Sequence, residues 1–242
     1  MTYFNDFPRT FYQFGESRDK EVIENISIYA DVVDQVRNAT TAYQDYYIQS
    51  NERPDQVSFK LYETPHYHWT FYLMNPKLRE CGWPHSQQNI FEQAIKLYTE
   101  TVLTTRTKLT DKFKIGQTIT GLTTGVTAKI NHREIDLGQL WIKDATGTFS
   151  AGETITSTNG DGVVESITLH STEVQYNAAH HYENADKEYV DIDPEVGPGS
   201  SLTEITWLDR LIAHNETLRE IKIIRPNIIT RVAEAFREAV KQ

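Results

Sequence analysis

The chain has 242 residues, enough for one large domain or two small ones, and its 24 basic against 34 acidic residues give a formal charge of −10. This balance argues against a nucleic-acid-binding protein, because binding to phosphates depends on clustered Lys and Arg. No stretch approaches the roughly 20 apolar residues of a membrane-spanning helix, and no basic and apolar leader opens the sequence. We therefore expect neither a transmembrane nor a secreted protein, and the default compartment is the cytosol.

A single cysteine and a high aromatic content set further bounds. Cys81 has no partner for an internal disulfide, and thiolate zinc sites need several such ligands, so neither is expected to hold the fold together. The 13 Tyr, 10 Phe and 4 Trp are typical of buried cores and of contact surfaces between proteins, since Tyr and Trp bury a large area and keep one polar group.

The first predicted segment, residues 1–42, is an arm followed by a helix. Residues 3–15 form an aromatic run in which Pro8 disfavours helix, and we expect a strand or an extended arm there. From Ser17 onward, apolar residues recur at three- and four-residue intervals, which predicts one amphipathic helix or two short ones. The positions concerned are Val22, Ile26, Tyr29, Val32, Val33 and Val36.

The next part of the chain predicts a strand and three helices. Residues 43–49 alternate enough to form a strand, and Asp55 is an N-cap candidate for a short helix after the following turn. A second helix is predicted to begin with Pro65 at its first position and to end at Pro76. A third helix is predicted from about Gln87.

Between residues 112 and 170 the composition shifts to Thr, Gly, Val and Ile, which indicates strands and turns. The stretch also repeats itself, because the pattern of residues 113–120 returns at residues 149–156. Two copies of one hairpin-like unit predict a small β-barrel or sandwich that serves as a scaffold.

The last part is predicted to be an acidic linker or arm over residues 171–201, followed by helices over residues 202–242 that Pro226 interrupts. The first of these helices carries an apolar face made of Ile205, Leu208, Leu211, Ile212, Leu218, Ile221 and Ile224. The last helix carries Ile228, Ile229, Val232, Ala235, Phe236 and Val240. A stripe such as Ile228, Val232 and Phe236 is expected to stay unburied in the isolated chain, which predicts poor solubility.

Chemical motifs are sparse. His66 with His68, and His180 with His181, could each be a metal pair, but no carboxylate or Cys set completes either site, so hydrogen-bonded or surface histidines are the favoured interpretation. The sequence has no nucleophile elbow, no phosphate-binding loop and no dinucleotide fingerprint, and nothing basic adjoins Cys81. We therefore expect no catalytic residue, no metal site and no cofactor, and the protein is not expected to be an enzyme.

Several short motifs resemble the baseplate wedge protein of contractile-tailed bacteriophages of the T-even type. They are Tyr46-Tyr47-Ile48, Arg53-Pro54-Asp55, Lys60-Leu61-Tyr62, Pro65, Trp69, Leu73-Met74-Asn75 and Gly82-Trp83-Pro84. The opening residues 3–15 and the near-terminal residues 218–224 resemble the same family, in the same order. The resemblance covers roughly residues 1–105 and 171–242, whereas the middle stretch is similar to small β modules of phage structural proteins.

Within that family, residues 46–75 resemble a LysM fold made of a strand, two short helices and a strand. The resemblance implies that Arg53 and Pro54 fix the turn before the first helix, that Tyr62 and Trp69 pack the helix pair, and that Trp83 with Pro84 caps the unit. It also implies a structural subunit of the virion tail baseplate, made in the host cytoplasm, that joins neighbouring wedges around the hub.

The partners implied are other wedge subunits and sheath-initiating or hub-proximal proteins, with no nucleic acid and no membrane. The main alternative is a peptidoglycan-binding LysM-type module that acts on the host cell wall, and a weaker one is an enzyme with an unrecognised site.

The predicted fold class is α+β, with a LysM-like module and its following helix over residues 43–111, helical N- and C-terminal segments, and an inserted small all-β domain over residues 112–170. The residues expected to form the core of the module or to contact partners are Tyr46, Tyr47, Ile48, Arg53, Pro54, Tyr62, Trp69, Trp83, Pro84, Ile221, Ile224 and Phe236.

Overall fold

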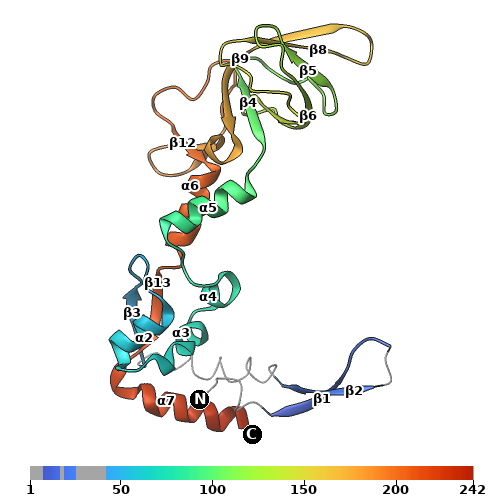
Figure 1. The fold of residues 1–242 in the computed structure, drawn as a ribbon. Helices are drawn as coiled ribbons and strands as arrows, with labels where there is room; N and C mark the ends of the chain where they lie inside the picture. Colours follow the sequence, from blue (N-terminus) through green and yellow to red (C-terminus); the bar gives the residue numbers. More distant parts are fainter. Residues whose placement is uncertain (1–7, 17–18, 26–41, 242) are drawn as a thin grey trace. The chain divides into compact units, whose positions relative to one another are not determined.

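A computed structural model of the chain describes residues 8–16, 19–25 and 42–241. The chain divides into two units (Figure 1). Unit 1 is built from both ends of the chain, Met1–Ser86 and His214–Gln242, and unit 2 is the stretch between them, Gln87–Ala213. Both units contain helices and strands, so the predicted α+β class is confirmed.

The N-terminal strands form a hairpin. Strand β1 (Arg9–Gln13) pairs antiparallel with β2 (Lys20–Glu24), and Phe11 lies opposite Val22. The strand expected in the aromatic run is confirmed, but the helix predicted from Ser17 is wrong over β2. The adjacent β-branched pair Val22-Ile23 between charged residues suits a pleated strand once β1 offers a partner. The remainder of that predicted helix, residues 26–41, lies outside the described residues.

The central part of unit 1 is a strand, two helices and a strand, which we call the βααβ module. It consists of β3 (Tyr43–Tyr47), α2 (Pro54–Tyr62), α3 (Trp69–Met74) and β13 (Glu220–Ile224). Strands β3 and β13 are antiparallel, and Tyr46 lies opposite Ile221. The strand predicted over residues 43–49 is therefore confirmed, whereas its partner lies near the C-terminus and not within residues 46–75.

The two helices of the module begin differently from the prediction. Arg53 and not Asp55 is the N-cap of α2, because Pro54 occupies the first helical position and the Gln56 side chain accepts a hydrogen bond from the Arg53 amide (3.0 Å). Asp55 lies in the first turn of the helix, where its negative charge suits the helix dipole.

The second predicted helix is divided into shorter ones. A 3₁₀ turn, η2 (Pro65–Tyr67), precedes α3, and Pro76 both follows the end of α3 and opens α4 (Pro76–Cys81). Proline has no amide hydrogen to donate and stands at a first helical turn without loss, so Pro76 ends one helix and starts the next.

Strand β13 corrects the prediction of one long helix through Ile221 and Ile224. Helix α6 (Trp207–Glu216) ends before this stretch, and the last three residues before β13 form a turn. The sequence Glu-Ile-Lys-Ile-Ile is rich in β-branched residues and alternates charged with apolar positions, and β3 supplies the pairing edge. The side chains of Ile221, Ile223 and Ile224 are buried.

The C-terminal helix is confirmed as α7 (Ile229–Lys241), which follows a 3₁₀ turn, η4 (Pro226–Ile228). Its apolar stripe is not left exposed, so that expectation is wrong. The Phe236 side chain is 3 % exposed and its ring centroid lies 4.8 Å from that of Trp69 on α3. The helix buries its stripe on the βααβ module of its own chain.

Unit 2 contains helix α5 (Gln87–Leu97), confirmed from about the predicted start, and a closed six-stranded antiparallel barrel in the order β4-β7-β6-β5-β8-β9. The strands are β4 (Thr101–Thr105), β5 (Thr118–Gly121), β6 (Thr127–Glu134), β7 (Gln139–Lys143), β8 (Thr154–Thr158) and β9 (Val164–Val174). The stretch 112–170 predicted to be β-rich lies within this barrel. Closure pairs every strand on both sides and leaves no free edge.

The sequence repeat has a structural counterpart. Phe113 and Phe149, which open the two copies, are both buried in the barrel core. Strands β5 and β8 pair with each other, and Thr120 lies opposite Thr156, its equivalent in the second copy (156 − 120 = 36). Exchanging β4 with β7, β5 with β8 and β6 with β9 preserves every neighbour relation in the barrel. The barrel therefore consists of two equivalent three-stranded halves.

A second, three-stranded sheet in unit 2 corrects the predicted linker. Its order is β11 (Tyr189–Val190), β10 (Ala179–Glu183) and β12 (Thr203–Thr206), with a 3₁₀ turn, η3 (Gln175–Asn177), before β10. The side chains of Ala179 and Tyr182 are buried. Ala179 and Tyr182 both pack although they are three positions apart, because the register with β12 shifts between Ala179 and His181, and β10 carries one acidic residue, Glu183. The helix expected from residue 202 begins only after β12, at α6.

Candidate functional site: the βααβ module and the hairpin

The predicted site residues divide by burial. Buried side chains are those of Ile48, Tyr62, Pro84, Ile221, Ile224 and Phe236; half-buried ones are those of Tyr46, Pro54, Trp69 and Trp83; Tyr47 and Arg53 are exposed. All except Phe236 on α7 lie in the module or in the segments that adjoin its strands and helices. Trp69 packs against Phe236 of α7, with the two ring centroids 4.8 Å apart.

The core of the module joins residues from both ends of the chain. Ile48 and Phe71 are fully buried together with Ile223. The Tyr62 hydroxyl donates a hydrogen bond of 2.8 Å to the carbonyl of Ile224, so α2 is tied to β13. Burial raises the pKa of the Tyr62 hydroxyl far above its ordinary value of 10.0.

The substitution Tyr62→Phe tests this bond. Removing the hydroxyl leaves a buried carbonyl without its donor, so we expect a loss of about 1–2 kcal/mol in the free energy of unfolding of unit 1 near neutral pH. Above about pH 10 the unfolded wild type gains stability by ionising Tyr62, and the folded state cannot. The difference in the free energy of unfolding between wild type and variant, measured by urea unfolding, should therefore become smaller at alkaline pH. A difference that stays constant with pH would contradict the burial of the Tyr62 hydroxyl.

A carboxylate organises the turn between β3 and α2. Glu52 accepts hydrogen bonds from the Gln49 amide (2.8 Å), the Tyr46 hydroxyl (3.0 Å) and the Lys60 ammonium (3.0 Å). Burial acts to raise the pKa of Glu52, but these three donors together lower it. The indole N–H of Trp83 donates to the Glu52 carbonyl (2.7 Å), which ties the segment after α4 to the same turn.

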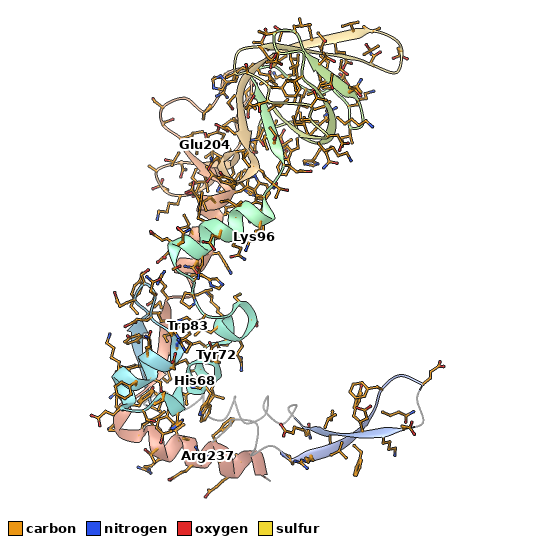
Figure 2. The ribbon with its side chains drawn as sticks, in the orientation of Figure 1. His68, Tyr72, Trp83, Lys96, Glu204 and Arg237 are labelled. Atoms are coloured by element: carbon orange, nitrogen blue, oxygen red, sulfur yellow. The ribbon has the colours of Figure 1, made fainter. Side chains whose placement is uncertain are left out.

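The Trp83 ring itself completes the module core. Its centroid lies 5.9 Å from that of Phe71 and 6.1 Å from that of Tyr72, and Figure 2 shows Tyr72 and Trp83 close together. One side chain thus packs on α3 through its ring and fixes the turn before α2 through its N–H.

Two buried polar side chains, which sequence reasoning missed, hold the point where the chain leaves unit 1 and returns to it. The Asn215 amide bonds both the N–H (2.7 Å) and the carbonyl (3.2 Å) of His85. The Arg219 guanidinium donates to the carbonyls of His85 (3.1 Å) and Ile48 (3.3 Å) and to the Glu216 carboxylate (2.8 Å). No motif marks these residues, because their role depends on main-chain groups far away in the sequence.

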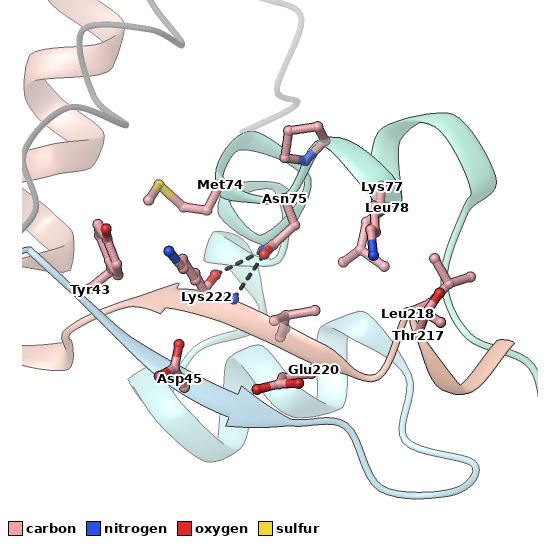
Figure 3. A pocket seen from close by; sticks show the side chains of 12 residues that line it. Tyr43, Asp45, Met74, Asn75, Lys77, Leu78, Thr217, Leu218, Glu220 and Lys222 are labelled. Atoms are coloured by element: carbon pink, nitrogen blue, oxygen red, sulfur yellow. Dashed lines mark hydrogen bonds between the residues drawn. The ribbon is translucent and has the colours of Figure 1, made fainter. Parts of the chain in front are cut away.

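A pocket of about 460 Å³ lies beside β13 (Figure 3). The Asn75 side chain pairs with both the N–H and the carbonyl of Lys222 at 2.8 Å and so occupies the outer edge of β13. The Lys222 ammonium lies 4.7 Å from the centre of the Tyr43 ring. The charged residues of the lining are Asp45, Lys77, Glu220 and Lys222. This mixed lining suits a polar segment and contains no nucleophile–base pair.

Apolar side chains are exposed on the hairpin and on α2. On β1 and β2, Phe11 is 72 % exposed and its cross-strand partner Val22 is 55 % exposed. On the other side of β1, the exposed rings of Tyr12 and Phe14 lie 4.8 Å apart. Phe59 on α2 is 62 % exposed. These side chains are available for contact with another protein.

The two histidine pairs lie in different units: His66 and His68 lie between α2 and α3 in the module, and the other pair lies in unit 2. His68 bonds the Pro65 carbonyl through Nδ1 (2.8 Å), and His180 and His181 lie on β10 in unit 2. In the part of the chain that the structure describes, no three His, Cys, Asp or Glu residues gather as metal ligands. None of the described helices is both long and apolar enough to cross a membrane.

Comparison with known proteins identifies one family. Residues 3–105 match the family described as base plate wedge protein 53, a segment that includes the hairpin, β3, α2 and α3 but not β13. No curated protein matches the chain significantly. The match supports a structural role in a phage baseplate, with other baseplate proteins as the associated class of partner and the virion tail as the location. Residues 3–105 are thus similar to a phage baseplate wedge family, in agreement with the resemblance seen in the motifs of that segment.

Proposed function

We propose that the protein is a structural subunit of the tail baseplate wedge that joins neighbouring wedges during assembly around the hub. The observation that carries this proposal is the family match over residues 3–105. Its partners are other wedge subunits and sheath-initiating or hub-proximal proteins. It acts without a cofactor, through apolar contacts that a polar rim keeps in register.

The hairpin is the surface best suited to such a contact. A two-stranded sheet alone is marginally stable in water, and this one exposes Phe11 and Val22 side by side. Burying both side chains against a partner would contribute about 1.5–3 kcal/mol each. The hairpin also lies inside the family-matching segment, which supports a role for it in the proposed assembly.

Serine at both positions tests the hairpin. We expect the double variant Phe11→Ser and Val22→Ser to enter particles about tenfold less than wild type, since the lost burial exceeds the 1.4 kcal/mol that corresponds to a factor of ten. The measurement is quantitative mass spectrometry of purified particles from complemented infections. Val163→Ser with Val164→Ser is a matched control, because these barrel residues are equally exposed and lie outside the family match. Wild-type incorporation of the hairpin variant would contradict the assignment.

The decisive experiment for the function itself is the amount of this chain in intact particles. Mass spectrometry should find it at a level comparable to other wedge subunits. A chain present in the lysate and absent from particles would overturn the proposal.

The second candidate is a peptidoglycan-binding module, and the pocket beside β13 is the observation that favours it. Binding of the isolated protein to peptidoglycan in a pulldown, weakened by Lys77→Ala and Lys222→Ala, would support this candidate. No binding, together with wedge-like abundance in particles, would remove it.

A further inference from the structure

A chain of hydrogen bonds crosses from α6 to β10 in unit 2. The Arg210 guanidinium lies 2.6 Å from Nε2 of His180, and Nδ1 of His180 lies 2.8 Å from Nδ1 of His181. Nε2 of His181 lies 3.0 Å from the carboxylate of Glu183. We call these four residues the histidine latch. Neither the family match nor the proposed function uses them.

The two ends of the latch fix its protons. A guanidinium only donates, so Nε2 of His180 accepts and the single proton of that ring is on Nδ1. That N–H donates to Nδ1 of His181, which must therefore be unprotonated. The single proton of the His181 ring is then on Nε2, which faces Glu183. A carboxylate accepts, so the direction agrees at the far end. All three bonds exist together only when both imidazoles are neutral.

The surroundings favour this state for His180. Its ring packs edge-on against Trp207 at 4.6 Å, and burial, then the Arg210 cation and His181, lower the pKa of His180 to about 4. On β11, Tyr189 stacks on His181 at 4.9 Å. The acidic residue of β12, Glu204, bonds the Tyr182 hydroxyl (3.4 Å) and takes no part in the latch.

We infer that the histidine latch is an acid-sensitive device that holds the first turn of α6 on β10. A proton added to His180 removes the acceptor of Arg210. A proton added to His181 preserves its bond to Glu183 but sets two N–H groups against each other at the Nδ1–Nδ1 contact. Either proton breaks one of the three bonds, so acidification releases α6 from β10 at this point.

Nitrogen-resolved NMR of the imidazoles in the full chain tests the inferred protons. At about pH 7.5 we expect the Nδ1–H tautomer for His180 and the Nε2–H tautomer for His181. Arg210→Gln should let His180 take up its second proton at a higher pH, whereas Arg210→Lys, which keeps a cation that only donates, should do so less. An Nε2–H tautomer for His180, or equal titration of His180 in Arg210→Gln and wild type, would overturn the inference.

Amide exchange tests the release. Protection factors of β10 and of residues 211–214, whose amides bond to carbonyls of the first turn of α6, should fall about tenfold or more between pH 7.5 and about pH 4. The pKa of His180 is about 4 in the folded protein and 6.5 ordinarily, and each pKa unit between these values corresponds to a factor of ten in stability. The double variant His180→Gln and His181→Gln should lack this dependence on pH, and His170→Gln, on the exposed side of β9, should retain it. Equal pH dependence in wild type and the double variant would refute the device.

Discussion

A fragment of residues 1–105 is expected to leave the βααβ module unfolded, although it contains the whole family-matching segment. It lacks β13, so β3 loses its only pairing partner among the described strands and the core loses Ile221, Ile223 and Ile224. Each buried Ile contributes about 1.5–3 kcal/mol, which together is comparable to the stability of an entire small domain. Far-ultraviolet circular dichroism and amide dispersion in NMR would measure the loss.

The control for this experiment is a chain in which a short Gly/Ser linker connects residues 1–86 to residues 214–242. Asn215 bonds the backbone of His85 in the native protein, so a linker of about four to six residues can close the gap. This chain is expected to fold, with β3 and β13 paired. Such a result would show that unit 1 folds without residues 87–213. A folded 1–105 fragment, or an unfolded joined chain, would contradict the assignment of β13 to the module.

Local patterns predicted those parts of the fold that local interactions decide. The alternation in residues 43–49, the turn before α2 and the apolar pattern of α7 each act within one element, and the strand, the turn and the helix are all found. The repeat of residues 113–120 also predicted a small β-barrel or sandwich, and the structure has the barrel. Sequence periodicity predicts an element correctly where interactions within that element are enough to determine its structure.

The errors arose where a distant partner decides the structure. Ile221 and Ile224 fit both a helical and a strand pattern, and only the open edge of β3 selects the strand. Val22 likewise fits both a helical and a strand pattern, and pairing with β1 selects the strand. The apolar stripe that includes Phe236 was expected to stay exposed in the isolated chain. Nothing in the sequence indicates that Trp69 packs against it.

Some residues of the candidate site could be predicted from local sequence patterns, and others could not. The aromatic and Arg53-Pro54 positions could be selected as core or contact residues, because large rings and a proline at a helix start have local meaning. Asn215 and Arg219 could not, since each is recognised only by the carbonyls it reaches. The exposed cross-strand pair on the hairpin likewise depends on a register that no single strand reveals.

Phe71→Ala is expected to destabilise unit 1 by about 3–5 kcal/mol, the usual cost of truncating a buried Phe. Its side chain is fully buried, stacks on Tyr62 at 6.1 Å and contacts Trp83, so a cavity would open between α2 and α3. Phe59→Ala makes the same chemical change on α2 at a side chain that is 62 % exposed, and should alter the free energy of unfolding by less than about 0.5 kcal/mol.

Urea unfolding followed by the fluorescence of Trp69 and Trp83, with Trp141 and Trp207 replaced by Phe, restricts this measurement to unit 1. If Phe59→Ala leaves the midpoint unchanged yet reduces entry into particles, Phe59 is a contact for another baseplate protein, since no loss of folded protein would account for the defect. Equal destabilisation by the two substitutions would contradict the exposure of Phe59 and the described placement of α2 against the core.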